Sequence, residues 1–143
     1  MPTVNCDKAA VTVSSGGHDG YRVVLGVVSV PPAYVPQVVP THNKYFRPWR
    51  FWSKAGLFVR AGTPAVVVSV PKAWQTRAAI TWGNAGTVSA LRLASCPVQP
   101  GVWNGYPGGF VLRASSACVP LVFRVGQQST TVRFGVGRRC SGS

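Results

Sequence analysis

The segment Lys44–Lys54 holds the densest cluster of side chains that could bind a ligand. Its sequence, Lys-Tyr-Phe-Arg-Pro-Trp-Arg-Phe-Trp-Ser-Lys, interleaves aromatic with cationic residues. Aromatic rings offer flat apolar faces to a sugar or a base, and guanidinium groups offer forked donors that match phosphate, sulfate or carboxylate oxygens. The pattern predicts a site for an anionic ligand, with these candidates: Lys44, Tyr45, Arg47, Trp49, Arg50, Trp52 and Lys54.

The same segment has two other interpretations. Short peptides rich in Trp and Arg also seek anionic membrane interfaces. Alternatively, the segment is a structural strand with Trp49 and Phe51 buried, Arg50 and Trp52 outward, and Arg stems stacked on the rings. Buried Trp is ordinary in β-sandwiches, so the sequence leaves the structural and the functional interpretation open.

Further candidate contacts lie nearer the C-terminus. Trp103-Asn-Gly-Tyr106-Pro-Gly-Gly109 reads as a Gly/Pro loop that either presents Trp103 and Tyr106 to a saccharide or plugs one end of the fold. Arg124 and Arg133 are expected on the exposed face of a terminal hairpin, where they would share one cationic surface. Trp74 and Trp82 flank Arg77 and are assigned to packing.

Catalysis is not expected. The chain has only two acidic side chains, Asp7 and Asp19, so paired-carboxylate chemistry lacks its groups. No Gly-x-Ser-x-Gly elbow accompanies His18 and Asp19, and no catalytic residue is assigned. Glycine-rich phosphate loops of the Gly-x-Gly-x-x-Gly or Gly-Lys-Ser/Thr type are also missing, so no cofactor is expected.

Charge is the strongest compositional signal. The 143 residues include 15 Lys and Arg against 2 Asp and no Glu, a net charge of +13. Hydrophobic residues make up 46%, which excludes a disordered basic tail and places the cations on a folded body. Such a surface repels itself unless anions screen it, so sulfate or phosphate should stabilise the protein more than chloride does.

Four cysteines, at positions 6, 96, 118 and 140, lack the close pairs typical of a zinc site, and His18 and His42 lie far from them. No metal site is expected. Their even number favours two disulfides and an oxidising compartment. Of three possible connectivities, Cys96–Cys118 with Cys6–Cys140 is preferred, because the first closes a short loop and the second ties the termini together.

Secretion is inferred from the cysteines alone. Residues 1–20 lack the basic start and apolar stretch of a signal peptide, so a signal is expected to be missing from this sequence. The longest apolar run, Val23–Val30, is interrupted by Gly26 and Ser29 and is too short to span a membrane. No transmembrane segment is expected.

Short β-branched runs separated by Gly and Pro recur along the chain, without a sustained helical period. We expect one domain, 1–143, folded as a single antiparallel, immunoglobulin-like β-sandwich. The expected strands are Ala10–Val13, Arg22–Val30, Gly56–Arg60, Ala65–Val70, Ala78–Trp82, Ser89–Ala94, Gly109–Arg113, Pro120–Val125 and Thr130–Val136.

Three connections have specific expectations. Gly83-Asn-Ala-Gly86 should be a hairpin turn. The last hairpin should turn at Gly126–Ser129, which pairs Phe123 with Val132 and places Arg124 opposite Thr131. The Pro-rich segment 31–48 is either a functional loop or a strap across a sheet edge.

Parts of the chain resemble a group of small secreted actinobacterial proteins with no established activity. The resemblance rests on Gly108-Gly-Phe-Val-Leu-Arg113, Cys118-Val-Pro-Leu-Val-Phe-Arg-Val125, Val132-Arg-Phe-Gly-Val-Gly-Arg-Arg-Cys140 and Ala78-Ala-Ile-Thr-Trp-Gly-Asn84. It implies an extracytoplasmic, disulfide-bonded β domain. It transfers no functional residue.

Three functions remain after these exclusions. The first is a secreted, basic, non-catalytic binding module for an anionic polymer of the cell envelope or extracellular matrix, such as a teichoic acid-like polymer or an acidic glycan. The second is an immunoglobulin-like structural or interaction module whose protein partner has an acidic surface. The third is non-specific nucleic-acid binding, which the charge permits and the extracellular setting disfavours.

Overall fold

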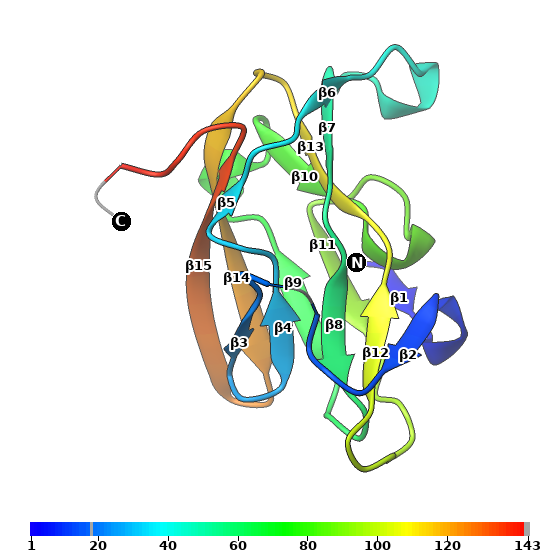
Figure 1. Ribbon diagram of the computed structural model, residues 1–143. Helices are drawn as coiled ribbons and strands as arrows, with labels where there is room; N and C mark the ends of the chain where they lie inside the picture. The colour runs from blue at the N-terminus through cyan, green and yellow to red at the C-terminus, as the bar shows by residue number, and fades with distance from the viewer. Residues whose placement is uncertain (18, 142–143) are drawn as a thin grey trace.

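The β-branched runs form strands along the whole chain, as their pattern predicted (Figure 1). The computed structural model describes residues 1–17 and 19–141, and in these residues every helical element is a short 3₁₀ turn. The strands are β1 (Thr3–Val4), β2 (Val11–Val13), β3 (Arg22–Val24), β4 (Val28–Val30), β5 (Tyr34–Val35), β6 (Val39–Pro40), β7 (Phe51–Lys54), β8 (Leu57–Arg60), β9 (Val66–Ser69), β10 (Ala78–Ile80), β11 (Ala90–Leu93), β12 (Trp103–Tyr106), β13 (Gly109–Leu112), β14 (Ala117–Val125) and β15 (Gln128–Val136). The 3₁₀ turns are Cys6–Lys8, Lys44–Phe46, Lys72–Trp74 and Trp82–Asn84.

Three sheets surround one hydrophobic core. Their strand orders are β1-β11-β9-β14-β15-β5, β10-β13-β7-β6 and β2-β12-β8-β4-β3. The pairs β1 with β11 and β5 with β15 are parallel, and the other pairs are antiparallel. Buried residues from all three sheets, such as Leu121, Phe110 and Leu57, belong to one cluster. The protein is all-β and sandwich-like, and its strand order does not identify an immunoglobulin-like topology.

Strand β14 shows how a period of two places side chains in this core. Leu121 and Phe123 are buried, whereas Val122 is half-buried and Arg124 is exposed. The ring of Phe123 packs edge-on against that of Phe134, with centroids 6.4 Å apart. Burial of each such ring stabilises the fold by about 1.5–3 kcal/mol, and ring packing joins β14 to β15 within the core.

Two stretches of chain, the ribbons β7–β8 and β12–β13, each continue from one sheet into another, and both bend at the same corner. Ala55 and Gly56 separate β7 from β8, and Pro107 and Gly108 separate β12 from β13. Strand β7 pairs with β13 and β8 pairs with β12. The ribbons bend together where the Ala55 N–H donates to the Gly108 oxygen at 2.9 Å. A Cβ on Gly108 would lie 2.5 Å from the Cα of Trp82, so this close approach requires glycine.

The stretch expected as one strand, Arg22–Val30, is a tight hairpin of β3 and β4. Leu25 and Gly26 both have positive φ angles, of 51° and 72°, and the Val27 N–H donates to the Val24 oxygen. The prediction was wrong because leucine rarely adopts a positive φ. An apolar leucine within an apolar run therefore indicated a continuous strand and not a turn.

The terminal hairpin forms, but its register differs from the prediction by two residues. Val125 pairs with Gln128, so the turn is Gly126-Gln127 and Phe123 lies opposite Thr130. Gly126 has a φ of 59°, which favours a two-residue turn over the longer one expected. Arg124 therefore lies opposite Ser129 instead of Thr131.

The two expected disulfides form, but the preferred pairing was wrong. Cys6 is bonded to Cys96, and Cys118 to Cys140. Because β1 runs parallel to β11, the residues that follow each strand lie side by side, which brings Cys6 to Cys96. Cys118 pairs with Gly135, and the chain after β15 folds back so closely over Gly135 that a Cβ there would meet the backbone N of Cys140 at 3.0 Å.

The Pro-rich segment 31–48 forms edge strands of two sheets and then projects from the sheets as a loop. Strand β5 is the last strand of the first sheet, and β6 is the last strand of the second. After β6 the chain leaves the sheets as a loop, seen at the upper right of Figure 1, which contains the 3₁₀ turn Lys44–Phe46. The first half of the segment covers edges, and the second half extends the surface next to β7.

Candidate binding site

The loop between β6 and β7 is fastened at its base. The Thr41 N–H donates to the Arg50 oxygen at 2.8 Å, and the Arg50 N–H donates to the Leu112 oxygen at 3.0 Å. Within the loop, the Trp49 N–H donates to the Phe46 oxygen at 2.7 Å. These bonds tie the loop to both β7 and β13, so its aromatic and cationic side chains project from a defined backbone.

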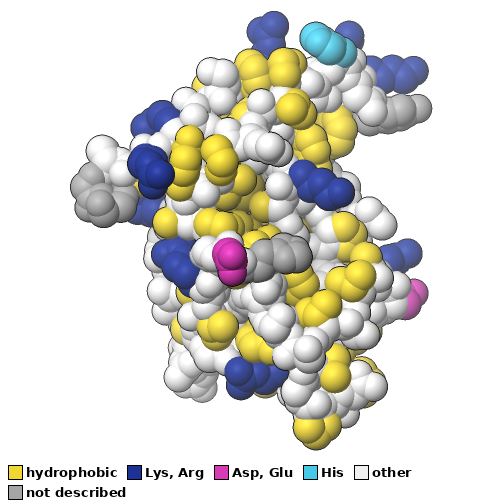
Figure 2. All heavy atoms as spheres, viewed as in Figure 1, with side chains coloured by type: hydrophobic (Ala, Val, Ile, Leu, Met, Phe, Trp, Pro, Cys, Tyr) yellow, Lys and Arg dark blue, Asp and Glu magenta, His cyan; other side chains and the backbone are white. Residues whose placement is uncertain are grey.

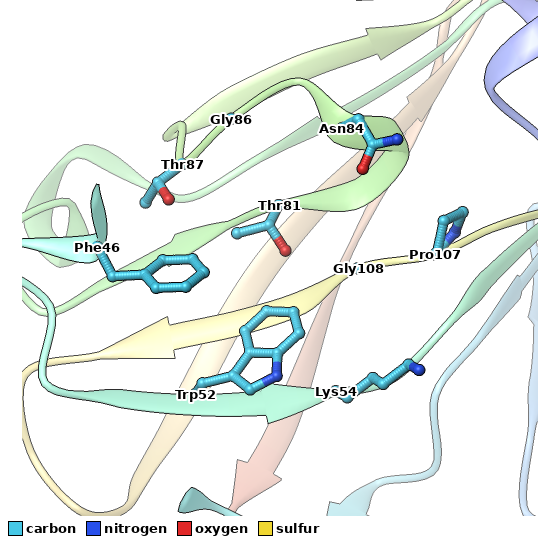
Figure 3. A pocket seen from close by; sticks show the side chains of 9 residues that line it. All are labelled: Phe46, Trp52, Lys54, Thr81, Asn84, Gly86, Thr87, Pro107 and Gly108. Atoms are coloured by element: carbon cyan, nitrogen blue, oxygen red, sulfur yellow. The ribbon is translucent and has the colours of Figure 1, made fainter. Parts of the chain in front are cut away.

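Phe46 and Trp52 form one wall of an open pocket at the corner of the ribbons (Figure 3). Their rings are stacked, with centroids 6.0 Å apart and planes inclined by 22°. The pocket has a volume of about 600 Å³, within the range of about 300–1,000 Å³ common for small-molecule sites. We call this the aromatic pocket, and its lining residues are Phe46, Trp52, Lys54, Thr81, Asn84, Gly86, Thr87, Pro107 and Gly108.

Strand alternation puts Trp52 and Lys54 into this pocket. Ser53, between them, is buried, and its hydroxyl donates to the Gln37 oxygen at 2.8 Å. Because successive side chains point to opposite faces, Trp52 and Lys54 share the other face of β7. Figure 3 shows the two on one strand, with Thr81 and Asn84 on the facing segment.

The facing segment supplies the polar groups. The Thr81 hydroxyl accepts a hydrogen bond from the Gly109 N–H at 3.1 Å, which holds its oxygen beside the corner. Asn84 is exposed and has a φ of 60° at the end of the 3₁₀ turn. The expected hairpin turn at Gly83–Gly86 lies between Ile80 and Val88, which form an isolated antiparallel bridge.

The loop also lines a second, more polar pocket. It has a volume of about 470 Å³, and we call it the cationic pocket, with these lining residues: Thr41, His42, Asn43, Arg47, Pro48, Trp49 and Arg50. Arg47 and Arg50 are both exposed, whereas Trp49 is half-buried. Two guanidinium groups beside an indole suit a carboxylate, sulfate or phosphate group.

Cations are not confined to this loop. Figure 2 shows Lys and Arg side chains spread over the whole visible face, with apolar side chains between them. Distributed charge attracts polyanions from a distance but selects none of them. Selectivity therefore requires pockets in which cations and rings are held together.

The structure brings most of the predicted segment together around these two pockets. Arg47, Trp49 and Arg50 line the cationic pocket, and Trp52 and Lys54 line the aromatic pocket. Lys44 is exposed in the 3₁₀ turn, and the side chain of Tyr45 lies outside the described part of the structure, as does His18. Arg124 and Arg133 share an exposed face of β14 and β15 but line neither pocket.

The predicted platform at Trp103 and Tyr106 was wrong. Both residues belong to the buried strand β12 and are 7% and 1% exposed. Arg60 covers the Trp103 ring, with its guanidinium carbon 4.9 Å from the ring centroid. The Gly and Pro residues suggested a loop, but Gly105 lies in β12 at a point where a Cβ would meet the Phe58 ring at 2.8 Å. Trp82, assigned to packing, is fully buried.

Several pocket residues had no signal in the sequence. Phe46 lay inside the predicted segment without a role of its own, and Thr81, Asn84, Thr87, Pro107 and Gly108 were not singled out as contacts. Their common feature is proximity to the corner, which depends on strand pairing. The spacing of Gly and Pro around 83–86 and 107–109 was the only trace of this bend.

The chain matches no protein-family model, and no curated protein sequence is similar to it. Among the described residues, no three His, Cys, Asp or Glu side chains gather in an arrangement that could hold a metal ion. In the same residues, no helix is both long and apolar enough to cross a bilayer.

Proposed function

We propose that this protein is a secreted, non-catalytic binding module for an anionic polymer of the cell envelope or extracellular matrix. The polymer would carry sugar-like units and acidic groups, as an acidic glycan or a teichoic acid-like chain does. The observation that carries the proposal is that one segment, 41–54, forms the cationic pocket and contributes Phe46, Trp52 and Lys54 to the aromatic pocket. The two disulfides support an oxidising setting outside the cytoplasm.

The aromatic pocket suits the uncharged part of such a repeat. The stacked rings of Phe46 and Trp52 offer apolar surface, and Lys54, Thr81 and Asn84 border it with polar groups. Ligand sites generally combine apolar walls with a few placed polar groups that orient the ligand. A sugar or polyol unit has both kinds of surface.

The cationic pocket suits the acidic part. Arg47 and Arg50 can each donate two parallel hydrogen bonds to a carboxylate or phosphate. Phe46 and Arg47 are neighbours in the chain and line different pockets. A polymer whose acidic groups alternate with ring-like units can therefore occupy both pockets at once, and the spread of other cations adds a general attraction.

Titration calorimetry tests this proposal with defined polymers. The probes are polygalacturonate, a poly(glycerol phosphate) chain, double-stranded DNA and an uncharged glucan, each measured at several sodium chloride concentrations. Binding of the first or second should be at least tenfold tighter than binding of DNA, and it should weaken with salt because bound counterions are released. Binding that ignores salt, or that favours DNA or the uncharged glucan, would contradict the proposal.

Two sets of variants separate a local site from general charge. Arg47→Ala with Arg50→Ala removes two cations of the cationic pocket, whereas Lys8→Ala with Arg92→Ala removes two exposed cations that line neither pocket. The first pair should weaken polymer binding by about tenfold or more, because charged hydrogen bonds are lost, and the second pair by much less. Equal losses of affinity in the two pairs would show that binding depends on net charge and not on the cationic pocket.

A further inference from the structure

A third pocket is lined by arginines from three separate parts of the chain. It has a volume of about 150 Å³, room for a small anionic group. We call it the guanidinium pocket, and its lining residues are Trp74, Arg77, Arg113, Ala114, Ser116, Ala117 and Arg138. None of these residues lines the aromatic or the cationic pocket.

Strand pairing places two of the arginines side by side. Arg77 directly precedes β10, and Arg113 directly follows β13. These strands are antiparallel, with Ala78 opposite Leu112, so the two arginines leave the sheet at the same edge. The Arg113 N–H donates to the Arg77 oxygen at 3.4 Å, which extends the pairing by one residue.

The third arginine comes from the C-terminal segment. Arg138 follows Gly137, which has a φ of 77° and at which a Cβ would lie 2.9 Å from the Ser115 oxygen. This tight approach brings the segment against Ser115 and Ser116. The Cys118–Cys140 disulfide then fastens the segment two residues beyond Arg138.

Trp74 orients one of the guanidinium groups. The Arg77 guanidinium carbon lies 3.5 Å from the centroid of the Trp74 ring. Stacking of this kind uses the flat face of the group and leaves its N–H donors, which lie in its plane, available to an acceptor. An aromatic wall beside forked donors is an arrangement that suits an oxyanion.

Arginines, but no acidic residues, line this pocket. Three arginines line it, and neither Asp7 nor Asp19, the two acidic residues of the sequence, is among its lining residues. Like charges that converge without compensation destabilise the folded state. Binding of an anion only to the folded protein would reverse that effect and stabilise the fold.

We propose that the guanidinium pocket binds a phosphate or sulfate group. A tetrahedral oxyanion presents several acceptor oxygens, which match the forked donors of the arginines that line this pocket. The group could be a free anion or part of a polymer chain. The proposal is independent of the loop pockets and holds even if the protein binds no glycan there.

The test measures binding of inorganic phosphate and sulfate to the full chain by calorimetry and thermal unfolding. Ionic strength is kept constant with sodium chloride, so only anion identity changes. In the variant Arg47→Ala with Arg50→Ala, which lacks the arginines of the cationic pocket, both oxyanions should bind with a one-to-one stoichiometry and raise the unfolding temperature above its value in chloride. Equal unfolding temperatures in all three salts, with no binding heat, would overturn the proposal.

Variants locate the site. Arg138→Ala and Arg77→Ala should each weaken phosphate binding by roughly tenfold or more, and Arg138→Lys should weaken it less because it keeps the charge but loses the fork. Arg92→Ala, which removes an exposed cation outside the pocket, should have little effect. Unchanged phosphate binding in Arg138→Ala and Arg77→Ala would overturn the proposal. A cooperative thermal unfolding transition in sodium chloride shows that each variant is folded.

A third titration distinguishes the two sources of the group. A short glycerol phosphate oligomer is compared with inorganic phosphate, each in the wild-type protein and in Arg138→Ala. Tighter binding of the oligomer that Arg138→Ala abolishes assigns the pocket to a polymer-borne phosphodiester. Tighter binding of inorganic phosphate that the same substitution abolishes assigns it to the free anion. An oligomer that binds equally well to both proteins, with no phosphate binding to either, contradicts the site.

Discussion

The guanidinium group of Arg113 lies over the indole ring of Trp49, with 5.7 Å between its carbon and the ring centroid. Trp49 lines the cationic pocket, and Arg113 lines the guanidinium pocket. This contact links a residue of one pocket to a residue of the other. The two pockets are therefore neighbours at this contact.

Coupling between the two pockets is the first prediction. Arg113→Ala and Arg50→Ala should each weaken binding of a poly(glycerol phosphate) chain, and the double variant should depart from additivity by about 0.5 kcal/mol or more, because the residues share Trp49 as a neighbour. Inorganic phosphate is too small to reach both pockets, so Arg50→Ala should leave its affinity for the guanidinium pocket unchanged. Calorimetry of both ligands measures the cycle. Strict additivity for the polymer would show that the pockets act independently.

The aromatic pocket should depend on the ring stack. Trp52→Ala removes one face of the stack with Phe46 and should weaken binding of polygalacturonate by about tenfold, since one stacked contact contributes about 1–3 kcal/mol. Trp52→Phe keeps a ring and should retain most of the affinity. The salt dependence of binding should stay unchanged in both variants, because no cation is lost. If Trp52→Ala lost affinity only because the salt dependence of binding changed, the assignment of Trp52 to a stacking contact would be contradicted.

The corner of the ribbons should tolerate no side chain. Gly108 has a φ of 149°, and a Cβ there would meet the Trp82 backbone at 2.5 Å, so Gly108→Ala should lower the free energy of unfolding by about 2–4 kcal/mol. Gly126→Ala is the matched control, because Gly126 also has a positive φ but no atom within 4 Å of an added Cβ. Its cost should be about 1–2 kcal/mol. Urea denaturation measures both, and equal losses would argue against the close approach.

The two disulfides should differ in how much they stabilise the fold and in their effect on phosphate binding. Replacing both cysteines of Cys6–Cys96 by Ser should lower the free energy of unfolding by about 4–5 kcal/mol, and the same change at Cys118–Cys140 by about 3 kcal/mol, because the first bond closes 90 residues and the second 22. Only the second change should weaken phosphate binding, since that bond holds the segment containing Arg138. Phosphate binding lost equally in both variants would indicate general unfolding instead.

Alkaline pH should destabilise the protein through buried tyrosines. Burial raises the pKa of Tyr106 and of Tyr21 above the ordinary value of 10.0. The folded state then holds these protons more tightly than the unfolded state, so stability is fully present below pH 10 and falls as the pH rises above it. Tyr106→Phe should reduce this fall, because it removes one of the two groups with a raised pKa. Urea midpoints between pH 9 and 11 provide the measurement, and a fall of equal size in Tyr106→Phe would contradict the role of that group.

Local pattern accounts for the parts of the fold that were predicted. Runs such as Val66–Ser69 and Leu91–Leu93 carry β-branched or alternating apolar residues, and their strands formed within a residue or two of the expected bounds. The turn at Leu25 could not be predicted from local pattern, because a positive φ at an apolar residue is imposed by the surrounding hairpin and leaves no mark in composition. Trp103 is a second case, since the Gly- and Pro-containing segment 103–109 reads as a loop until the two strands that pair with β12 are known.

The sequence alone determined the all-β class, the presence of two disulfides and the position of the segment 44–54, because each depends on composition or on spacing within a few residues. Only the tertiary structure decided which cysteines pair, that Trp103 and Tyr106 are buried, and that Arg77, Arg113 and Arg138 line one pocket. These are relationships between residues far apart in the chain. They follow from strand order, which is set by the packing of the whole core and is not encoded in any single segment.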